Sequence, residues 1–323
     1  MKPQLKSSVR EIRTLGSVGV GLLKVSSPST RRRGLVTRPY SIIGMFVLFH
    51  PYADTDGGIS MTNWAEFRVL ITGGTRGIGF ATARLLTQRG ATVAIVGTDQ
   101  ARADEAARRL AAEDRPGRAY GIGAIIDGKE TTGQMIVERA RECMGPLTAL
   151  VNAAGGATVG HALELPWDVW QMDFDVKLWG YFSVIRAAVP DLSIKGGVIV
   201  NILGVAGKDP NPRLAPSTAV NGALRGLTKI LADDLAPLNI RVVAVNPGAT
   251  ETDLLPKMAA GYAKMNGETV REALARMRAA GPLGRLPAAP DIAATVVFLM
   301  SEDAALITGT SIDIDGGVHR GPA

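Results

Sequence analysis

Short apolar runs rich in β-branched residues recur along the chain, and this recurrence limits the possible folds more than any other feature. The runs lie at 68–72, 92–96, 120–126, 147–151, 197–203, 240–245 and 311–314. Segments with helical apolar spacing separate them, at 77–89, 100–113, 131–144, 166–190, 215–236 and 290–301. Continuous apolar runs of this length suit strands buried on both faces of a parallel sheet. The alternation therefore predicts an α/β fold: a doubly wound, mostly parallel seven-stranded sheet with helices on both faces.

Residues 1–60 differ from the rest in charge. They hold nine Lys and Arg and three acidic residues, which leaves 27 basic and 27 acidic residues for 61–323. Because nucleic-acid binding needs a basic patch on the folded surface, no nucleic-acid partner is expected. We expect residues 1–60 to be disordered and 61–323 to form a single domain. Three interpretations of 1–60 stay open: a start codon assigned upstream of Met61, a cleaved targeting segment, or a basic arm or membrane-surface anchor.

Cysteine content and apolar run length bear on location. Cys143 is the only cysteine, so no intramolecular disulfide can form, which favours a reducing, cytoplasmic location. The longest candidate for a membrane span, 41–49, has half of the ~18 residues that a spanning helix needs. We therefore expect no membrane association. No cluster of Cys and His with ligand spacing is present, so no metal site is expected.

The sequence TGGTRGIG, residues 72–79, follows the first predicted strand directly and opens the first predicted helix. Gly73 permits a tight turn, Gly77 lets the backbone approach a diphosphate, and Gly79 packs the helix on the strand. The helix N-terminus then presents free N–H groups and the positive end of its dipole. In this position the loop predicts a dinucleotide-binding site at the carboxyl ends of the strands.

The loop resembles the TGxxxGxG motif of the short-chain dehydrogenase/reductase family, and further motifs follow in the family's order. They are Asn152-Ala153-Ala154-Gly155, Pro247-Gly248, Thr252, Pro282-Leu283-Gly284-Arg285 and Ile314-Asp315-Gly316-Gly317. The resemblance covers about residues 66 to 318. It implies a single Rossmann-type domain that binds NAD(H) or NADP(H), oxidises or reduces a small alcohol or carbonyl substrate, and assembles as a homotetramer or homodimer.

The resemblance also implies which residues bind the cofactor. They are Gly73, Thr75, Arg76, Gly77, Ile78, Gly79, Thr98, Asp127, Asn152, Ala153, Gly155, Pro247, Gly248, Thr250 and Thr252. Among them, Asn152 would brace the sheet, and Asp127 would end the third strand near the adenine. The second strand closes at Gly97 without a carboxylate, while Thr98 and Arg76 suit a 2′-phosphate. Asp99 has near the spacing of a ribose-binding acid, so the signals conflict, and we favour NADP(H).

The catalytic positions depart from the family pattern. The family's Asn, Ser, Tyr and Lys fall at Lys177, Gly204, Ser217 and Asn221. A serine hydroxyl is a much weaker acid than a tyrosine with pKa near 10, and it is shorter, so Ser217 cannot replace the tyrosine. Lys177 and Asn221 look like the family's Asn and Lys exchanged. Either Lys177 acts as a general acid or electrostatic anchor beside the nicotinamide ribose, or it reaches solvent while Asn221 packs.

Three functions follow from this pattern. The first is an NAD(P)-dependent oxidoreductase with a non-standard active site. The second is a cofactor-binding sensor or non-catalytic subunit, and the third is elimination, isomerisation or decarboxylation in the same pocket. Other polar residues are weaker candidates: Lys208, Asp209 and Arg213 either bind an acidic substrate or form a solvated loop, and His161 is expected at the surface.

Overall fold

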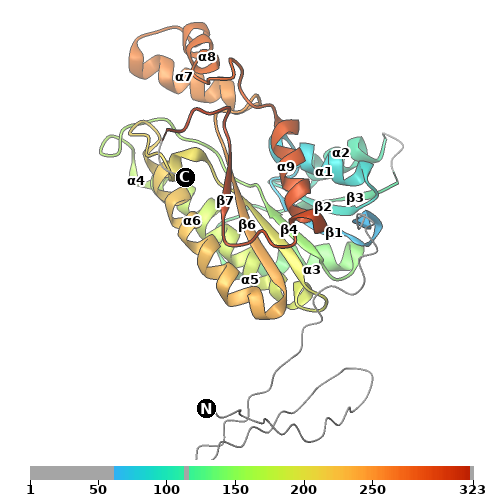
Figure 1. Cartoon of the computed structure of the whole chain (residues 1–323). Helices are drawn as coiled ribbons and strands as arrows, with labels where there is room; N and C mark the ends of the chain where they lie inside the picture. Colours follow the sequence, from blue (N-terminus) through green and yellow to red (C-terminus); the bar gives the residue numbers. More distant parts are fainter. Residues whose placement is uncertain (1–61, 113–115, 321–323) are drawn as a thin grey trace, which may run out of the picture. The chain divides into compact units, whose positions relative to one another are not determined.

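Seven strands form one sheet in this computed structural model, which describes residues 62–112 and 116–320 (Figure 1). The strands are β1 (Arg68–Thr72), β2 (Thr92–Gly97), β3 (Arg118–Gly123), β4 (Ala149–Asn152), β5 (Gly197–Ile202), β6 (Ile240–Pro247) and β7 (Ser311–Ile314). Their order is β3-β2-β1-β4-β5-β6-β7, and every neighbouring pair is parallel. The predicted doubly wound, parallel sheet is therefore confirmed. The expectations for residues 1–60 fall outside the described residues.

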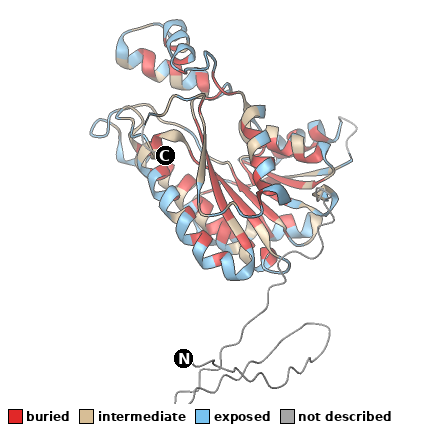
Figure 2. Ribbon diagram, viewed as in Figure 1, coloured by how far each residue is buried: buried red, intermediate tan, exposed pale blue. Residues whose placement is uncertain are grey.

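The strands are apolar on both sides because both faces of the sheet are covered. In β1, Val69 and Ile71 pack in one apolar cluster while Leu70 packs in another, and all three are fully buried. Figure 2 shows the strands as the buried centre of the fold. A continuous apolar strand, rather than an alternating one, follows directly from this two-sided burial.

Helices cover the two faces of the sheet in separate layers. They are α1 (Gly77–Gln88), α2 (Gln100–Ala111), α3 (Glu130–Met144), α4 (Trp167–Asp173), α5 (Gly180–Leu192), α6 (Ala215–Leu235), α7 (Leu255–Asn266), α8 (Val270–Ala279) and α9 (Ala289–Met300). One apolar cluster joins α1, α2 and α9 to the sheet. A second joins α3, α5 and α6 to the opposite face. The strand order reverses between β1 and β4, which places a ligand crevice at their carboxyl ends.

One strand boundary differs from the sequence-based prediction. The run 120–126 was expected to be a strand, but β3 spans Arg118–Gly123, whereas the other strands agree within two residues. Residues 124–126 are apolar for another reason. A Cβ on Gly180 would lie 2.3 Å from Ile126 Cγ2, so this loop packs against α5 instead of pairing in the sheet.

The long helix predicted over 166–190 is three consecutive pieces. Between α4 and α5 lies η2 (Phe174–Trp179), a π-helical turn. The Gly180 N–H donates to the carbonyl oxygens of Asp175 and Lys177 where this turn ends. A π-helical turn widens the helix by about one residue and is frequent at functional sites. Here it contains Lys177.

A helical hairpin follows β6 that the apolar pattern did not predict. Gly267 ends α7 in the left-handed conformation, and Thr269 begins α8 with a capping box to Glu272. The hairpin has a small apolar core of its own, against which Val159 and Leu214 pack from the loops after β4 and β5. It therefore adjoins the carboxyl ends of the strands, where the ligand crevice lies (Figure 1).

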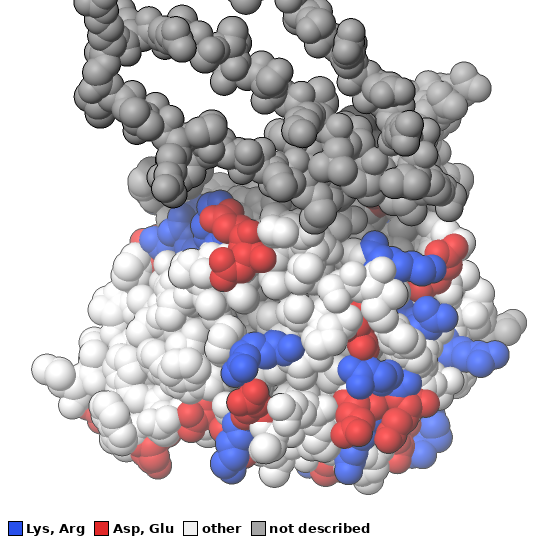
Figure 3. Space-filling view, turned by 90° about the horizontal axis from the view of Figure 1, so that it is seen from below, with Lys and Arg blue, Asp and Glu red and all other residues white. Residues whose placement is uncertain are grey.

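The charged side chains do not separate by sign on the face drawn in Figure 3, where basic and acidic groups lie next to one another. This agrees with the equal number of basic and acidic residues in 61–323. Within the described ranges, no helix has the length and apolar character to cross a membrane.

Candidate active site

The glycine-rich loop between β1 and α1 has the close backbone contacts that a diphosphate site requires. Gly73 has φ +64°, and a Cβ on it would lie 2.7 Å from Ala154 Cα. A Cβ on Gly79 would lie 2.4 Å from the Gly73 carbonyl oxygen. Both positions exclude a side chain, which keeps the loop, α1 and the loop after β4 in contact. No side chain caps the N-terminus of α1, so its first N–H groups can face an anion.

Asn152 braces the strands beneath this loop. Its side-chain amide donates to Asn201 Oδ1 at 3.0 Å, and its Oδ1 accepts from Thr72 Oγ1 at 3.5 Å. Thr72 Oγ1 in turn accepts the backbone N–H groups of Ala153 and Ala154 at 3.1 and 3.3 Å. The ends of β1, β4 and β5 are thereby tied together. Asn152 is fully buried, so it supports the crevice from within the sheet.

The end of β2 presents no free carboxylate to the crevice. Gly97 closes the strand, and a Cβ on it would lie 2.5 Å from Thr75 Cγ2. Asp99 caps α2, because its Oδ1 accepts the Arg102 N–H at 2.9 Å, and its other oxygen lies 3.2 Å from Arg102 Nε. Arg76 is exposed, and its guanidinium forms no ion pair with any residue that the structure describes. The Asp99 side chain thus caps α2, whereas the Arg76 guanidinium, which lies in the glycine-rich loop, forms no ion pair among the described residues.

Asp127 lies four residues beyond β3, not at its end as expected. Its carboxylate accepts from Lys129 Nζ at 2.6 Å and from Thr132 Oγ1 at 2.7 Å. These side-chain hydrogen bonds lower the pKa of Asp127 to about 2. The residue therefore carries a permanent negative charge, and it organises the start of α3.

The loop after β6 faces the glycine-rich loop. A Cβ on Gly77, whose φ is +55°, would lie 3.6 Å from Thr252 Cγ2. Thr250 Oγ1 donates to the Gly248 carbonyl at 2.9 Å, and Thr252 Oγ1 donates to the Thr250 carbonyl at 3.4 Å. A Cβ on Gly248 would lie 2.9 Å from Asp315 Cβ, so the Pro247-Gly248 turn packs closely on the segment after β7. The two predicted ends of the cofactor site are therefore neighbours.

Lys177 does not reach solvent. Its side chain is 8% exposed, and its Nζ donates to the Leu203 carbonyl at 3.0 Å. A Cβ on Gly155, whose φ is +148°, would lie 3.4 Å from Lys177 Cδ. Burial lowers the pKa of Lys177 to about 8, and the charge of Asp173 opposes this shift. The ammonium therefore lies at the carboxyl end of β5, beside the loop that follows β4.

The other three tetrad-equivalent positions lie around the same strand end. A Cβ on Gly204 would lie 3.0 Å from Asn221 Nδ2, and the Asn221 Oδ1 is buried without a hydrogen-bond partner among the described residues. Ser217 Oγ donates to Asp173 Oδ2 at 3.4 Å. Lys177 and Asn221 thus approach adjacent residues, Leu203 and Gly204, from opposite helices.

Asp173 is the residue that the sequence analysis did not identify. It ends α4, is 9% exposed, and lies one helical turn before Lys177. Burial raises the pKa of its carboxyl, while the Lys177 charge and the Ser217 hydrogen bond oppose the shift. The sequence did contain a signal for Asp173: an acidic residue four positions before Lys177 in the predicted helix 166–190.

Tyr181 is close to these residues but is committed to the backbone. Its hydroxyl lies 2.9 Å from the Ala154 carbonyl and 3.1 Å from the Ile202 carbonyl, and its side chain is 1% exposed. Burial raises the pKa of the phenol well above its ordinary value. Tyr181 therefore links the loop after β4 to the end of β5 and does not replace the missing acid.

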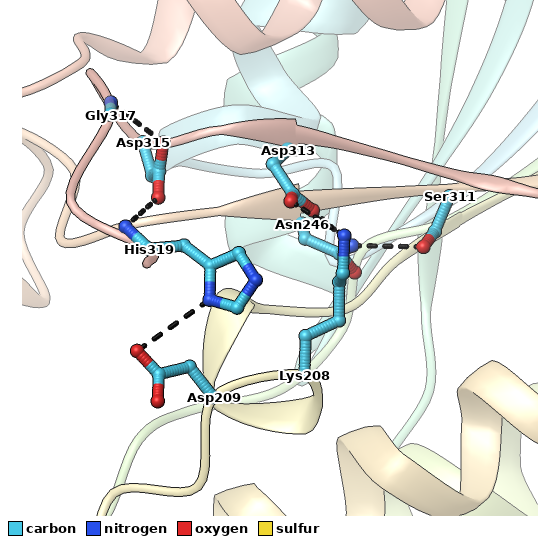
Figure 4. A network of polar contacts seen from close by, with 8 residues as sticks. All are labelled: Lys208, Asp209, Asn246, Ser311, Asp313, Asp315, Gly317 and His319. Carbon is cyan, nitrogen blue, oxygen red and sulfur yellow. Dashed lines mark hydrogen bonds and ion pairs between the residues drawn. The ribbon is translucent and has the colours of Figure 1, made fainter. Parts of the chain in front are cut away.

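The loop after β5 is fastened to the C-terminal segment, as Figure 4 shows. Lys208 Nζ lies 2.8 Å from Asp313 Oδ2 on β7, and the Asp313 Oδ1 accepts from Asn246 at 2.7 Å. The Lys208 side chain is 7% exposed. Asp209 lies 3.5 Å from His319 Nδ1. Lys208 is therefore a structural ion-pair partner, and the interpretation of it as a solvated charge is wrong.

A cavity of about 500 Å³ opens at the edge of the crevice. Gly77 and Thr252 lie on its rim, while most of its lining comes from the outer face of α1 and the start of α9. Its lining includes residues from both ends of the predicted cofactor site but not Lys177. His161, as expected, is exposed.

Comparison with known proteins identifies the family. The model of a family described as enoyl-(acyl carrier protein) reductase matches residues 73–319. The chain is 34% identical over 252 residues to 2-(S)-hydroxypropyl-CoM dehydrogenase 3 of Xanthobacter autotrophicus, covering 77% of this chain and 95% of that protein. The chain therefore belongs to the short-chain dehydrogenase/reductase family.

Solved structures agree with this membership. L-sorbose reductase of Gluconobacter frateurii, solved with NADPH and L-sorbose, has a TM-score of 0.73 and 28% identity, covering 80% of this chain and 98% of that chain. A 3-ketoacyl-(acyl-carrier-protein) reductase of Brucella melitensis, solved with NADH, has a TM-score of 0.67 and 32% identity, covering 78% and 98%. Oxidoreductases of this family with either nicotinamide cofactor thus share the fold.

The residues present fit a nicotinamide dinucleotide. The close contacts at Gly73 and Gly79 form a cradle that a Cβ would fill, at the mouth of the crevice between β1 and β4. Thr252 lies beside Gly77 of this loop, and the Asn152 side chain links β4 to β5 beneath it. Of the cofactor residues expected from the sequence, those of the glycine-rich loop follow β1, Asn152 ends β4 and Pro247 ends β6, whereas Asp127 lies beyond β3.

Proposed function

We propose that this chain is an NAD(P)-dependent oxidoreductase of a small carbonyl or alcohol substrate, with Lys177 in place of the family's tyrosine acid. The observation that carries the proposal is the buried ammonium at the carboxyl end of β5, with the Leu203 carbonyl as its hydrogen-bond partner. An ammonium has three N–H donors, so two are left to bind a substrate oxygen. Family membership and the intact glycine-rich loop support the use of a cofactor.

The proton chemistry follows from that placement. The nicotinamide, when bound, supplies or accepts the hydride. In the reducing direction Lys177 gives a proton to the substrate oxygen, its N–H bond breaking as the O–H bond forms. The neutral amine regains a proton from water that enters the crevice after the product leaves. Because burial lowers the pKa of Lys177 to about 8, this transfer is easier than from an ordinary lysine.

We propose NADP(H) as the preferred cofactor. Gly97 brings no carboxylate to the end of β2, and the Asp99 carboxylate is occupied as the cap of α2. A 2′-phosphate would meet Thr98 and the guanidinium of Arg76 without opposing charge from either of these positions.

The first test is a fluorescence titration of the full chain with NADPH and NADH, followed by a screen of small carbonyl and alcohol substrates. We expect saturable binding that is tighter for NADPH. Lys177→Ala should keep cofactor binding and lose at least ~100-fold in turnover, the usual contribution of a general acid. Equal turnover in wild type and Lys177→Ala would exclude the proposed role.

A second function is favoured by a specific observation. Ser217 occupies the tyrosine position, is 5% exposed, and donates to Asp173, so it cannot act on a substrate as the tyrosine does. A cofactor-binding sensor or non-catalytic subunit would need no acid at this position. Saturable NADPH binding together with no turnover across the substrate screen would favour this function.

We further propose a cytoplasmic homotetramer or homodimer. Family membership supports oligomers, and Trp167, Met172 and Trp179 are large apolar side chains that are 80%, 55% and 49% exposed. The free thiol of Cys143 suits a reducing compartment. Light scattering after size-exclusion chromatography should give a mass of two or four chains, and a monomer at micromolar concentration would contradict this.

A further inference from the structure

Four buried polar side chains meet where the family has its catalytic tetrad, and one of them stands outside the tetrad-equivalent positions. Asp173, Lys177, Ser217 and Asn221 are 9%, 8%, 5% and 3% exposed. Burying a carboxylate or an ammonium is costly unless it is paired, so a cluster of this kind needs a reason. The two charged residues come from one helical stretch, and the two neutral ones from α6.

The hydrogen bonds leave part of this cluster unused. Asp173 accepts one long bond, 3.4 Å from Ser217, and Lys177 donates to the Leu203 carbonyl at 3.0 Å. The Asp173 carboxylate and the Lys177 ammonium form no direct ion pair, and the Asn221 Oδ1 accepts no hydrogen bond from the described residues. Buried polar atoms in folded proteins usually have partners, so the Asn221 Oδ1 is an exception that needs a reason.

The other charged or titratable groups around Lys177 point elsewhere. On η2, Asp175 accepts from Gln171 and acts on Lys129 at the start of α3. On α5, the Tyr181 hydroxyl is bound to backbone carbonyls. The loop after β5 contributes Lys208, which is paired with Asp313. The first two turns of α6 bring Ser217 and Asn221, which carry no charge. Asp173 is therefore the single charged group that acts on Lys177 among the described residues.

We propose that Asp173, held in place by Ser217, is a positioning residue that keeps the buried Lys177 protonated for reaction. The proposal rests on the proposed function and adds a residue to it. Asp173 lies one helical turn before Lys177, and the hydroxyl of Ser217 holds its carboxylate toward α6. The serine at the tyrosine position then has a role of its own: it orients the counter-charge and does not transfer the proton.

The energetics agree with this geometry. Burial alone disfavours the ammonium, and the nearby carboxylate offsets part of that effect, so that the pKa of Lys177 is about 8. At neutral pH Lys177 is therefore mostly protonated, and its charge opposes the rise that burial causes in the pKa of Asp173. Removing the carboxylate would lower the pKa of Lys177 further and would leave the amine neutral at a lower pH.

The test is a double-mutant cycle of stability against pH, and it needs neither cofactor nor substrate. It compares the full-length wild type with Lys177→Met, Asp173→Asn and the double variant between pH 7 and 10.5. A lysine whose pKa is lower in the folded than in the unfolded chain adds stability as pH rises between the two values. The free energy of unfolding of the wild type, relative to that of Lys177→Met, should therefore rise from about pH 8 upward. When Asp173→Asn is compared with the double variant, the same rise in relative stability should begin roughly 1 pH unit lower.

Each outcome of the cycle has one meaning. If the rise in relative stability begins at the same pH with and without the Asp173 carboxylate, the proposal is overturned. Asp173→Glu keeps the charge and should restore the wild-type onset, and Asp168→Asn, an exposed acid on the same helix, should not move it. If Asp173→Asn does not fold, Asp173→Ser replaces it in the cycle. Failure of the proposed function would appear separately, as no cofactor-dependent turnover by the wild type or as equal turnover in Lys177→Ala.

Discussion

The two halves of the crevice differ in how closely their residues follow the family pattern. At the ends of β1 and β4, the glycine-rich loop and the Asn152 brace have the residues and contacts that the family pattern implies. At the end of β5, the sequence analysis predicts other residues at all four tetrad positions, and the structure adds a buried acid, Asp173, which accepts from Ser217.

The difference shows that binding a cofactor and acting on a substrate depend on different parts of the chain. The cofactor half depends mostly on the backbone, because Gly73 and Gly79 act by lacking a side chain. The β5 half depends on side-chain chemistry, and there the buried ammonium belongs to Lys177 on the π-helical turn. One half can therefore be altered experimentally with little effect on the other.

The largest effect should come from Gly73→Ala. The added Cβ would lie 2.7 Å from Ala154 Cα in a backbone with φ +64°, which forces the loop away from β4. We expect a loss of about 1–3 kcal/mol in the free energy of unfolding and at least ~100-fold in NADPH affinity. Gly156→Ala, where a Cβ would meet nothing within 4 Å, is the matched control. Unchanged NADPH affinity in Gly73→Ala would show that the cofactor half is not where the fold places it.

The second effect concerns stability in the β5 half. Asp173→Asn combined with Lys177→Met removes both buried charges, so chemical unfolding at pH 7 should give an equal or higher free energy of unfolding, by up to about 4 kcal/mol. Turnover should be lost and NADPH binding kept. A double variant that is less stable than the wild type by more than about 1 kcal/mol would indicate that the charged pair serves the fold instead.

A smaller effect should come from Arg76→Ala. Loss of the guanidinium should weaken NADPH binding by roughly 10-fold, the contribution of one charge-assisted contact, and should leave NADH binding nearly unchanged. Isothermal titration with both cofactors measures the ratio of their affinities. An equal loss for NADPH and NADH would mean that Arg76 contacts a part common to both, such as the diphosphate.

The smallest effect should come from Gly204→Ser, which restores the family's residue at one position. The Gly204 backbone is extended, with φ 170°, and the nearest atom to a new Cβ is the movable Asn221 Nδ2 at 3.0 Å. We expect a change in melting temperature equivalent to less than about 1 kcal/mol. Thermal unfolding checks this, and a severe loss of stability would show that Asn221 cannot move.

The fold was largely predictable because it depends on the apolar pattern. Two-sided burial makes each strand a continuous apolar run, and this signal survives without any knowledge of tertiary contacts. The same signal failed at 124–126, which lies beyond β3: Ile126 packs against Gly180 of α5, and Ile125 is 70% exposed. It also missed the hairpin of α7 and α8, whose ends are marked instead by Gly267 and the capping box of Thr269 and Glu272.

The site was predictable only in part, because side-chain partners far apart in sequence are invisible to spacing. The tetrad-equivalent positions could be located from flanking motifs, but the bond from Ser217 to Asp173 joins residues 44 positions apart. Lys208 appeared to be a loop residue for the same reason, since its partner Asp313 comes 105 residues later. What the sequence did contain was the spacing of Asp173 and Lys177, one helical turn apart.

The tie between the loop after β5 and the C-terminal segment has a consequence for synthesis. Lys208 leaves the ribosome well before Asp313, so the loop beside Lys177 has no anchor until β7 has been made and added to the sheet. The β5 half of the crevice should therefore be among the last parts of the domain to mature on a translating ribosome, whereas the glycine-rich loop and β4 are synthesised much earlier.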